Sequence, residues 1–334
     1  CDPELLDIGG KSGSRKAFRE AGIPRPAGHE DLADTAEIAE ALADLKHRSP
    51  SLARSVVKLN DGFSGEVNAV FSYTGCPKGD CRAWVKAHLP LNLAFEARDM
   101  NWEHYVEKLD RMGGIVEEWI PGPDVRSPSV QMRITPVGKL EMISTHDQIM
   151  GGPTGQIFQG STFPADPAYA KEIQTLSAKV GKVLQRKKVL GRFGVDFVSI
   201  RQKDRWKHYA IEINLRKGGT THTYQMLQFL TNGQYDSSKA EFVTPTGQKR
   251  AYYATDNLMN PIYRRLTPDD LIDISVQRGI HFDQTSQQGV VFSVIGALSR
   301  YGKLGVIAIA GDQVKARAMF NRARVTIDAE AAKD

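Results

Sequence analysis

The sequence predicts a mixed α/β fold of the α+β kind, built from more than one unit. The chain has 334 residues, enough for two or three globular units with buried cores. Segments with helical apolar spacing alternate with β-rich segments along the chain. Pro121-Gly122-Pro123 lies between two groups of these segments and is typical of a hinge between lobes.

Apolar spacing and capping residues indicate the individual elements. Gly22 and two prolines end the first helix, and Asp166-Pro167 supplies a cap and an N1 proline to a later one. We predict helices at 12–21, 34–45 and about 102–112, from 166, at 224–230, from 266 and from 312. We predict strands at 55–59, 67–73, 82–87, 115–120, 129–135, 139–144, 194–200, 206–214, 290–298 and 303–310. Residues 233–261 are expected to be loop-like.

Composition and charge exclude several classes of protein. The net charge is +5 with scattered basic residues, so no continuous basic face predicts nucleic-acid binding. No apolar run approaches the roughly 20 residues that span a bilayer, and the acidic start is unlike a signal peptide. Three cysteines are too few for a disulfide framework and favour a reducing cytoplasm. Because the chain does not begin with Met, we expect a segment to precede it.

The strongest chemical signal is a pair of acidic residues on two adjacent predicted strands. Residues i and i+2 of a strand point to one face, so Glu212 and Asn214 project together and Asp196 can join them. Two carboxylates and an amide oxygen are hard donors that suit Mg²⁺ bound to nucleotide phosphates. The simpler interpretation is the polar face of a half-exposed sheet, but apolar neighbours on both sides favour the functional one.

Other segments offer groups that neutralise or contact a nucleotide. Arg216 continues the alternation, and the glycine-rich turn 217–223 then opens a helix whose N–H groups suit an anion. Lys58 ends a strand before the glycine loop 61–66, which can close over phosphates. Strand 117–120 can contact an adenine, and Asp124 a ribose. An ordinary hairpin turn and an edge strand with a linker are the alternative interpretations of the last two segments.

These elements, in this order, resemble the ATP-grasp superfamily. The order is a lysine, a glycine loop, an acidic hinge, an aspartate and Glu-x-Asn-x-Arg, and the opening around Gly10-Lys11 resembles its first segment. Within the superfamily, five strings resemble the pheganomycin-type peptide ligases. They are LNDGFSGEVNA, VEEWIPGPD, GGPTGQIFQG, EINLRKGGTTHT and VVFSVIGALSRYGKLG. The similarity extends from about Lys11 to Ala329.

The resemblance implies a two-lobed ATP-grasp fold with the nucleotide between two mostly antiparallel sheets. It also implies a small C-terminal α/β unit, and the N-terminal domain that precedes this region in the family is expected to be missing. The expected divisions are an opening segment at 1–26, an N-terminal lobe with a glycine-rich lid at 27–120, a C-terminal lobe with the magnesium site at 121–235, and an appendage at 236–334.

The resemblance also implies ATP and two Mg²⁺ ions, with Mn²⁺ as a substitute. The phosphates would contact Lys11, Lys58 and the lid residues Gly62, Phe63, Ser64, Gly65 and Glu66. The adenosine would contact Glu117, Glu118, Trp119, Ile120 and Asp124. The metal ligands would be Asp196, Glu212 and Asn214, and the catalytic cations Arg216 and Lys58. Two residues depart from the family pattern, Val67 in place of a glycine and Ser293 in place of a histidine.

The implied enzyme joins a small-molecule carboxylate to an amine, an amino acid or peptide, as in natural product biosynthesis. The joining would proceed through an acyl phosphate and release ADP and phosphate, which requires positioning and charge stabilisation but no nucleophilic side chain. Two alternatives stay open: an ATP-grasp kinase or carboxylating enzyme, and an ATP-binding module without catalysis. No nucleic-acid or membrane partner is expected, and the sequence identifies neither the substrates nor the oligomeric state.

Overall fold

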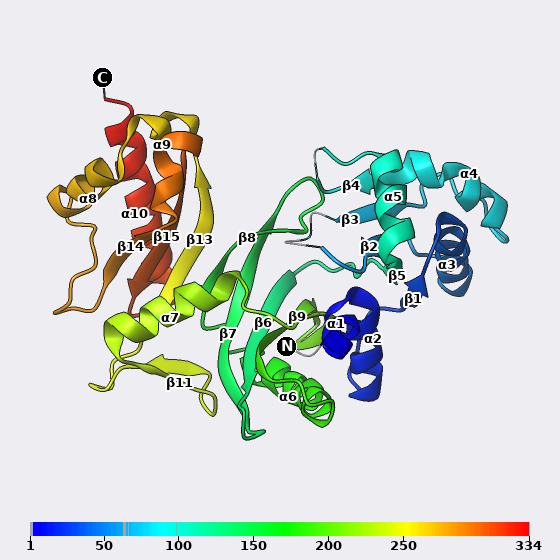
Figure 1. The fold of residues 1–334 in the computed structure, drawn as a ribbon, viewed down its shortest axis with the longest axis horizontal. Helices are drawn as coiled ribbons and strands as arrows, with labels where there is room; N and C mark the ends of the chain where they lie inside the picture. Colours follow the sequence, from blue (N-terminus) through cyan, green and yellow to red (C-terminus); the bar gives the residue numbers. More distant parts are fainter. Residues whose placement is uncertain (1–2, 63–64, 66, 98, 334) are drawn as a thin grey trace.

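The computed structural model, which describes residues 3–62, 65, 67–97 and 99–333, places two large antiparallel sheets side by side. A five-stranded sheet forms the N-terminal lobe, on the right in Figure 1. An eight-stranded sheet begins in the centre and continues into the C-terminal unit on the left. The predicted mixed α/β fold, with two mostly antiparallel sheets, is confirmed.

The N-terminal lobe is a sheet in the order β1-β5-β2-β3-β4, packed against helices. Its strands are β1 (Gly28–Leu32), β2 (Arg54–Leu59), β3 (Asn68–Ser72), β4 (Leu93–Phe95) and β5 (Gly114–Glu118). Its helices are α3 (Thr35–Arg48), α4 (Arg82–Asn92) and α5 (Trp102–Met112). Apolar side chains of these elements form one buried cluster that includes Leu42, Val57 and Tyr105. Burying this face against the helices holds the strands that carry Lys58 and Glu117.

The opening segment packs between the two lobes. It consists of η1 (Pro3–Leu5), α1 (Leu6–Gly9) and α2 (Lys11–Glu20). Ala17 and Phe18 of α2 are buried in the core of the larger sheet. The N-H of Lys11 donates to the carbonyl of Asn60 in the N-terminal lobe (3.1 Å), so α2 is tied to both lobes.

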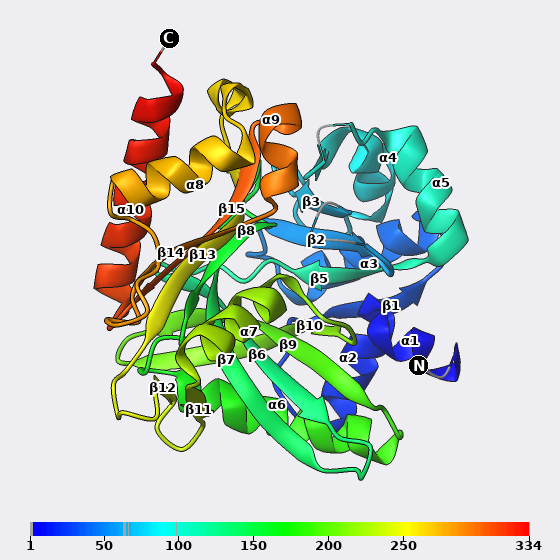
Figure 2. The same cartoon turned by 60° about the vertical axis from the view of Figure 1, so that its left-hand side comes forward.

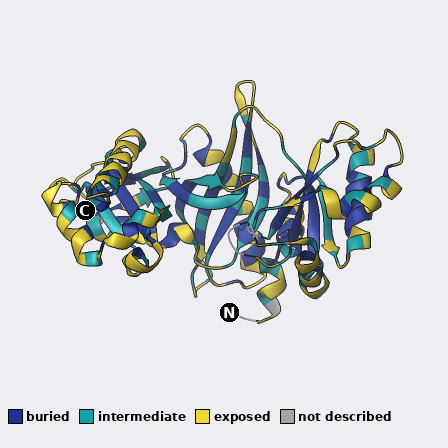
Figure 3. Ribbon diagram, turned by 90° about the horizontal axis from the view of Figure 1, so that it is seen from above, coloured by how far each residue is buried: buried dark blue, intermediate teal, exposed yellow. Residues whose placement is uncertain are grey.

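The first five strands of the larger sheet follow the order β10-β9-β6-β7-β8. They are β6 (Val125–Ile134), β7 (Leu140–Gly151), β8 (Ile157–Phe163), β9 (Gly191–Gln202) and β10 (Arg205–Asn214). Helix α6 (Ala170–Arg186) covers one face through a buried stripe that includes Ile173 and Val180, and α7 (Gly219–Thr231) follows β10. Figure 3 shows the buried residues concentrated in the strands of both lobes, with exposed residues on the outer helices.

The C-terminal unit extends the same sheet rather than forming a separate one. Its strands β13 (Ala251–Met259), β15 (Lys303–Ala310) and β14 (Gly289–Ser293) follow β8 in that order. The remaining elements are β11 (Gln234–Asp236), β12 (Glu241–Val243), η2 (Pro261–Arg265), α8 (Pro268–Gln277), η3 (Ile295–Ala297), α9 (Leu298–Tyr301) and α10 (Gln313–Ala331). Helix α10 lies along β13 and β15 (Figures 1 and 2). The sheet is thus continuous across the predicted boundary at 235, and the domain division stays a prediction.

Three secondary-structure predictions are wrong. Residues 82–87 begin helix α4 instead of a strand, because Val85 and Leu89, four residues apart, bury one helical face. The predicted strand 290–298 ends at Ser293, where Val294 adopts a left-handed conformation with φ +56° before a helical turn. Within the predicted loop 233–261, alternate residues Tyr252 and Ala254 are buried in strand β13.

Phe163, at the end of β8, joins the central strands to the C-terminal unit. Its ring is fully buried and lies 5.0 Å from Tyr252, 5.4 Å from Tyr224 and 5.7 Å from Phe242, measured between ring centroids. These contacts connect β8 with β13, α7 and β12. The aromatic cluster therefore stabilises the continuous sheet.

We predict that Phe163→Ala lowers the free energy of unfolding by about 3–5 kcal/mol, because it leaves a cavity among three rings. Phe229→Ala is the matched control, since the Phe229 side chain is 85% exposed, and it should change stability by less than about 0.5 kcal/mol. Urea unfolding of both variants measures the difference. Equal losses for the two would contradict this account of the sheet.

Candidate active site

A β-bulge in β10 brings the two predicted acidic residues opposite each other. Ala210 pairs with Phe197, and the next pair is Glu212 with Asp196, so Ile211 is the extra residue. Without the bulge, Ile211 would stand opposite Asp196 and Glu212 would point to the other face. The bulge therefore places two carboxylates side by side on one face of the sheet.

Asn214 completes this group. Its Nδ2 donates to Asp196 Oδ2 (2.9 Å), and Ser129 on the neighbouring strand β6 also hydrogen-bonds to Asp196. Burial, and secondly the negative charge of Glu212, raise the pKa of Asp196 to about 6. Two adjoining carboxylates in a buried site are stabilised by a cation between them.

These residues fit a magnesium ion. Mg²⁺ prefers oxygen ligands and is commonly bound by one or two carboxylates together with substrate phosphates and waters. Asp196, Glu212 and Asn214 offer two carboxylates and one amide oxygen. Among the described residues, no group of three or more His, Cys, Asp or Glu side chains could hold a metal ion. The acidic pair with its amide thus suits an ion whose remaining ligands come from a nucleotide and water.

Lys11 lies against this group. Its Nζ donates to Glu212 Oε1 at 2.6 Å, and its side chain is 7% exposed. The ammonium balances part of the negative charge of the two carboxylates. Helix α2 therefore contributes a cation to the site, although Lys11 does not line the cavity described below.

A second charged network surrounds Lys58 in the N-terminal lobe. Lys58 Nζ donates to Glu117 Oε2 (2.7 Å), and Arg15 from α2 donates to Glu117 Oε1 (2.5 Å). Burial opposes ionisation of Glu117, but the charges of Lys58 and Arg15 together lower its pKa. Glu117 is 1% exposed, so its carboxylate holds Lys58 in place instead of facing solvent.

A cavity of about 420 Å³ lies between the lobes and joins the two charged networks. Most of the predicted site residues line it: Lys58, Gly65, Glu117, Glu118, Trp119, Ile120, Asp196, Glu212, Asn214 and Arg216. Lys11, Gly62 and Asp124 are not among its lining residues, and Asp124 pairs with Arg126 (2.9 Å). Phe63, Ser64 and Glu66 of the predicted lid lie outside the described residues.

Glycines at two places in this site are required by close contacts. A Cβ on Gly62 would lie 1.9 Å from Cγ2 of Val67, so the valine that departs from the family pattern packs against that glycine. A Cβ on Gly219 would lie 2.9 Å from Cε1 of Phe158. Gly218, Gly219 and Thr220 line the cavity at the N-terminus of α7, where helical N–H groups favour an anion.

Several residues that line the cavity were not predicted from the sequence. They lie in segments that were not predicted to be strands or were not assigned to the site. They are Gln131, Met150, Thr154, Gly155, Gln156, Ile157, Phe158, Asp256, Asn257 and Lys303. Of the neighbouring polar residues His146, Asp147 and Gln148 on β7, only Gln148 lines the cavity. His146 is buried against Tyr252 (2.7 Å), and burial lowers its pKa to about 3. Asp147 accepts from Tyr169 (2.6 Å) on the other face.

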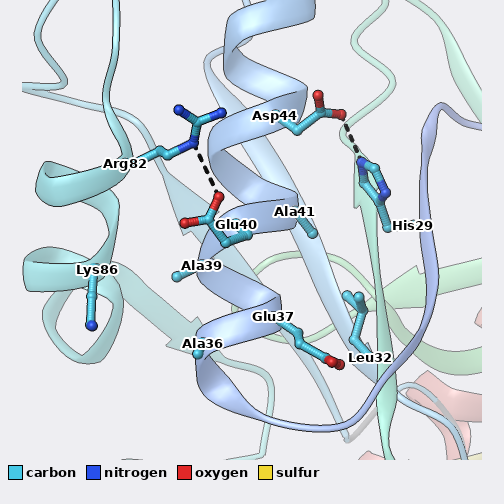
Figure 4. Close-up of a pocket in the computed structure, with 10 residues that line it drawn as sticks. All are labelled: His29, Leu32, Ala36, Glu37, Ala39, Glu40, Ala41, Asp44, Arg82 and Lys86. Carbon is cyan, nitrogen blue, oxygen red and sulfur yellow. Dashed lines mark hydrogen bonds and ion pairs between the residues drawn. The ribbon is translucent and has the colours of Figure 1, made fainter.

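A second hollow, of about 560 Å³, lies on the N-terminal lobe between α3, α4 and β1 (Figure 4). Two polar contacts lie along it: His29 contacts Asp44 (2.8 Å) and Arg82 contacts Glu40 (3.1 Å). These groups are at least a third exposed, so the pairs are weak and the hollow resembles an ordinary polar surface. No helix among the described residues is long and apolar enough to cross a membrane.

The fold and the site define a nucleotide-binding class of protein, and the comparisons agree. The profile of the IQCH-like ATP-grasp family matches residues 6–94 and 83–238, and that of the PGM1 C-terminal domain matches residues 270–322. The chain therefore belongs to the ATP-grasp superfamily, as the motif order predicted.

Two curated relatives align with most of the chain. It is 28% identical over 311 residues to the L-propargylglycine–L-glutamate ligase of Streptantibioticus cattleyicolor, covering 90% of this chain and 60% of that protein. It is 22% identical over 350 residues to the IQ motif-containing protein H of Danio rerio, covering 93% of this chain and 32% of that protein. The chain thus spans less than two thirds of the length of either relative.

Solved structures share the fold at low sequence identity. The ADP complex of PurK, an N5-carboxyaminoimidazole ribonucleotide synthetase, superposes with a TM-score of 0.59 at 13% identity, covering 99% of this chain and 74% of that one. The biotin carboxylase domain of the Hydrogenobacter thermophilus 2-oxoglutarate carboxylase gives 0.61 at 12% identity, covering 96% and 66%. These likenesses support the two-lobed fold.

We predict that Asp196→Asn stabilises the metal-free protein more at pH 8 than at pH 4. The folded pKa of about 6 lies above the ordinary value of 3.8, so the ionised carboxyl destabilises the fold above pH 6. That cost disappears as the pH falls below about 4, where the group is protonated in both states. The two-unit shift corresponds to a gain roughly 2 kcal/mol larger at pH 8 than at pH 4.

Urea unfolding in the presence of a chelator measures this difference. Asp204→Asn is the control, because Asp204 is exposed in the turn between β9 and β10 and should show no such dependence. A gain from Asp196→Asn that is the same at both pH values would contradict the buried carboxylate pair.

Proposed function

We propose that the chain is an ATP-dependent carboxylate–amine ligase that forms an amide through an acyl phosphate. The observation that carries the proposal is the half-buried pair of Asp196 and Glu212, with Asn214, in a cavity that is also lined by Lys58 and Arg216. ATP-grasp membership and the similarity to a ligase of two amino acids support the same chemistry. The substrates are accordingly a small carboxylic acid and an amine, either an amino acid or a peptide.

The proposed reaction has two steps. An oxygen of the carboxylate substrate attacks the γ-phosphorus of ATP, the bond to the β-phosphate oxygen breaks, and ADP leaves. The amine nitrogen then attacks the acyl carbon, the bond to phosphate breaks, and an amide, phosphate and one proton are released. Both steps move negative charge between oxygens, so fixed cations lower the barriers without a nucleophilic side chain.

We assign the residues of the chain to this reaction by their positions. Lys58 and the N-terminus of α7 would neutralise phosphate oxygens, and Arg216 would stabilise the acyl phosphate. Asp196, Glu212 and Asn214 would hold Mg²⁺, which shields the phosphate oxygens when bound. We propose two such ions, with Mn²⁺ as a substitute. Lys11 would join the phosphates by leaving Glu212.

The hinge and lid complete the proposed nucleotide site. Glu118, Trp119 and Ile120 line the cavity beside Val125, which suits an adenine ring. Glu117 would act by holding Lys58, and Asp124 would reach a ribose only by leaving Arg126. The lid would be 62–66. A cytoplasmic location also stays a prediction, in keeping with the free thiols of Cys76 and Cys81.

We predict that ADP release by the wild type requires both an acid and an amine. We also predict that Glu212→Gln lowers kcat by roughly 100-fold or more, which is the loss typical of a missing transition-state contact. The matched control is Glu141→Gln, since Glu141 near the start of β7 pairs with Arg133 on β6 (2.6 Å), does not line the cavity and should retain turnover. A coupled ADP assay with pairs of amino acids and short peptides, with product mass recorded, measures this.

The same assay separates the alternatives. ADP release with an acid or alcohol but no amine would indicate a kinase, and release with bicarbonate a carboxylating enzyme. ATP binding with no acceptor-dependent ADP release would indicate a non-catalytic module. Full turnover by Glu212→Gln at saturating Mg²⁺ would refute the proposed site.

A further inference from the structure

A second β-bulge brings a carboxylate of the C-terminal unit into the same cavity. In the pairing of β13 with β15, Thr255 faces Val306 and the next pair is Leu258 with Leu304. Asp256 and Asn257 therefore both stand opposite Gly305. Bulges turn side chains away from the regular alternation, and here both bulge residues line the cavity.

The bulge is held in place by its neighbours. The N–H of Asn257 donates to Thr255 Oγ1 (3.0 Å), and Asn257 Nδ2 donates to Gln159 Oε1 on β8 (3.2 Å). A Cβ on Gly305 would lie 2.1 Å from Ser293 Oγ, so strand β14 packs closely behind it. Asp256 therefore has a defined position in the sheet and does not belong to a loose loop.

Lys303, the first residue of β15, also lines the cavity. Lys303 and Asp256 are both half-buried, and within the described part of the chain neither forms an ion pair with another side chain, although His222 on the first turn of α7 interacts electrostatically with Asp256. This contrasts with Lys11 and Lys58, which are each paired with a glutamate. A half-buried charge without an ion pair is unfavourable, and a ligand of opposite charge would relieve the cost.

The position in the sheet separates these two groups from the metal carboxylates. The strand order runs β10-β9-β6-β7-β8-β13-β15, so β13 is four strands from Asp196 on β9. At about 4.8 Å a strand, this is roughly 19 Å along the sheet. Arg216 and the N-terminus of α7 line the same cavity. Asp256 and Lys303 therefore line a part of the cavity wall away from the metal carboxylates.

The order of the two charges indicates which substrate binds there. Asp256 lies on the strand nearer the metal carboxylates, and Lys303 on the strand beyond it. A zwitterion with its ammonium at Asp256 and its carboxylate at Lys303 points its nitrogen toward the site of phosphoryl transfer. An amine substrate must present its nitrogen to the site of phosphoryl transfer in this way. An acid substrate would instead present its carboxylate to that site.

We propose that Asp256 and Lys303 bind the amine substrate as a zwitterion, an amino acid or short peptide with a free ammonium and a free carboxylate. The inference rests on the proposed ligase function and adds the residues that bind the second substrate and the charged groups by which they bind it. Asp256 accepts hydrogen bonds from the ammonium, and Lys303 donates to the carboxylate. Each is a charge-assisted contact, which typically changes affinity by roughly 10-fold to 100-fold when it is removed.

Steady-state kinetics of ADP release test the proposal. We expect Lys303→Gln and Asp256→Asn each to raise the KM of the amine by at least roughly 10-fold, with the KM of ATP and of the acid nearly unchanged. We also expect the wild type to show a raised KM for an amine substrate whose carboxylate is replaced by an amide. This KM should match the one that Lys303→Gln shows for the free acid. Lys315→Gln and Asp269→Asn are controls, because both side chains are exposed on helices of the C-terminal unit. Thermal unfolding verifies that the variants fold.

Equilibrium titration keeps the inference independent of turnover. Each standard L-amino acid and each glycyl dipeptide is titrated into the protein with Mg²⁺ and a non-hydrolysable ATP analogue. Binding that both variants weaken supports the subsite, and the amino-acid and dipeptide arms identify which kind of zwitterion it takes. Binding without turnover would retain the inference and refute the ligase function. Turnover with an unchanged amine KM, a changed acid KM instead, or no binding of any probe would overturn the inference.

Discussion

The structure depends on bringing two like charges together in a half-buried place. Asp196 and Glu212 are directly opposed only because Ile211 is an extra residue in β10, and desolvation followed by the charge of Glu212 raises the pKa of Asp196. The fold tolerates this repulsion through Lys11, Asn214 and Ser129. Because the two negative charges repel each other, the site is well suited to bind a cation. A bound metal ion is what phosphoryl transfer requires, so the repulsion is consistent with that chemistry.

The two lobes are coupled through the same balance of charge. Helix α2 supplies Lys11 to Glu212 and Arg15 to Glu117, so one short helix contributes cations to both networks. Lys58 and Lys11 are each held by a carboxylate at 2.7 and 2.6 Å. An incoming polyphosphate would compete with those carboxylates for the two lysines, and Mg²⁺ would take the place of Lys11 at Glu212. Helix α2 is therefore part of the site.

Much of the site could be predicted because its residues share short motifs. Glu212 and Asn214 follow the alternation of β10 and Arg216 comes two residues after its end, and the structure places all three in one cavity. The contribution of the C-terminal unit could not be predicted, since a bulge at Asp256 breaks the alternation on which sequence reasoning relies. Helix α4 buries only two residues, Val85 and Leu89. Its apolar pattern is therefore too sparse to distinguish a helix from a strand by sequence alone. Long-range pairing, such as that of Phe163 with Tyr252, has no local signal.

The most direct test of the central claim is the anomalous diffraction of Mn²⁺ in crystals grown with a non-hydrolysable ATP analogue. The account predicts a manganese peak at bonding distance, roughly 2.1 Å, from Asp196 and Glu212 and beside the amide of Asn214, with Lys11 moved away from Glu212 toward the phosphates. A nucleotide bound elsewhere, or a metal peak that touches neither carboxylate, would contradict it.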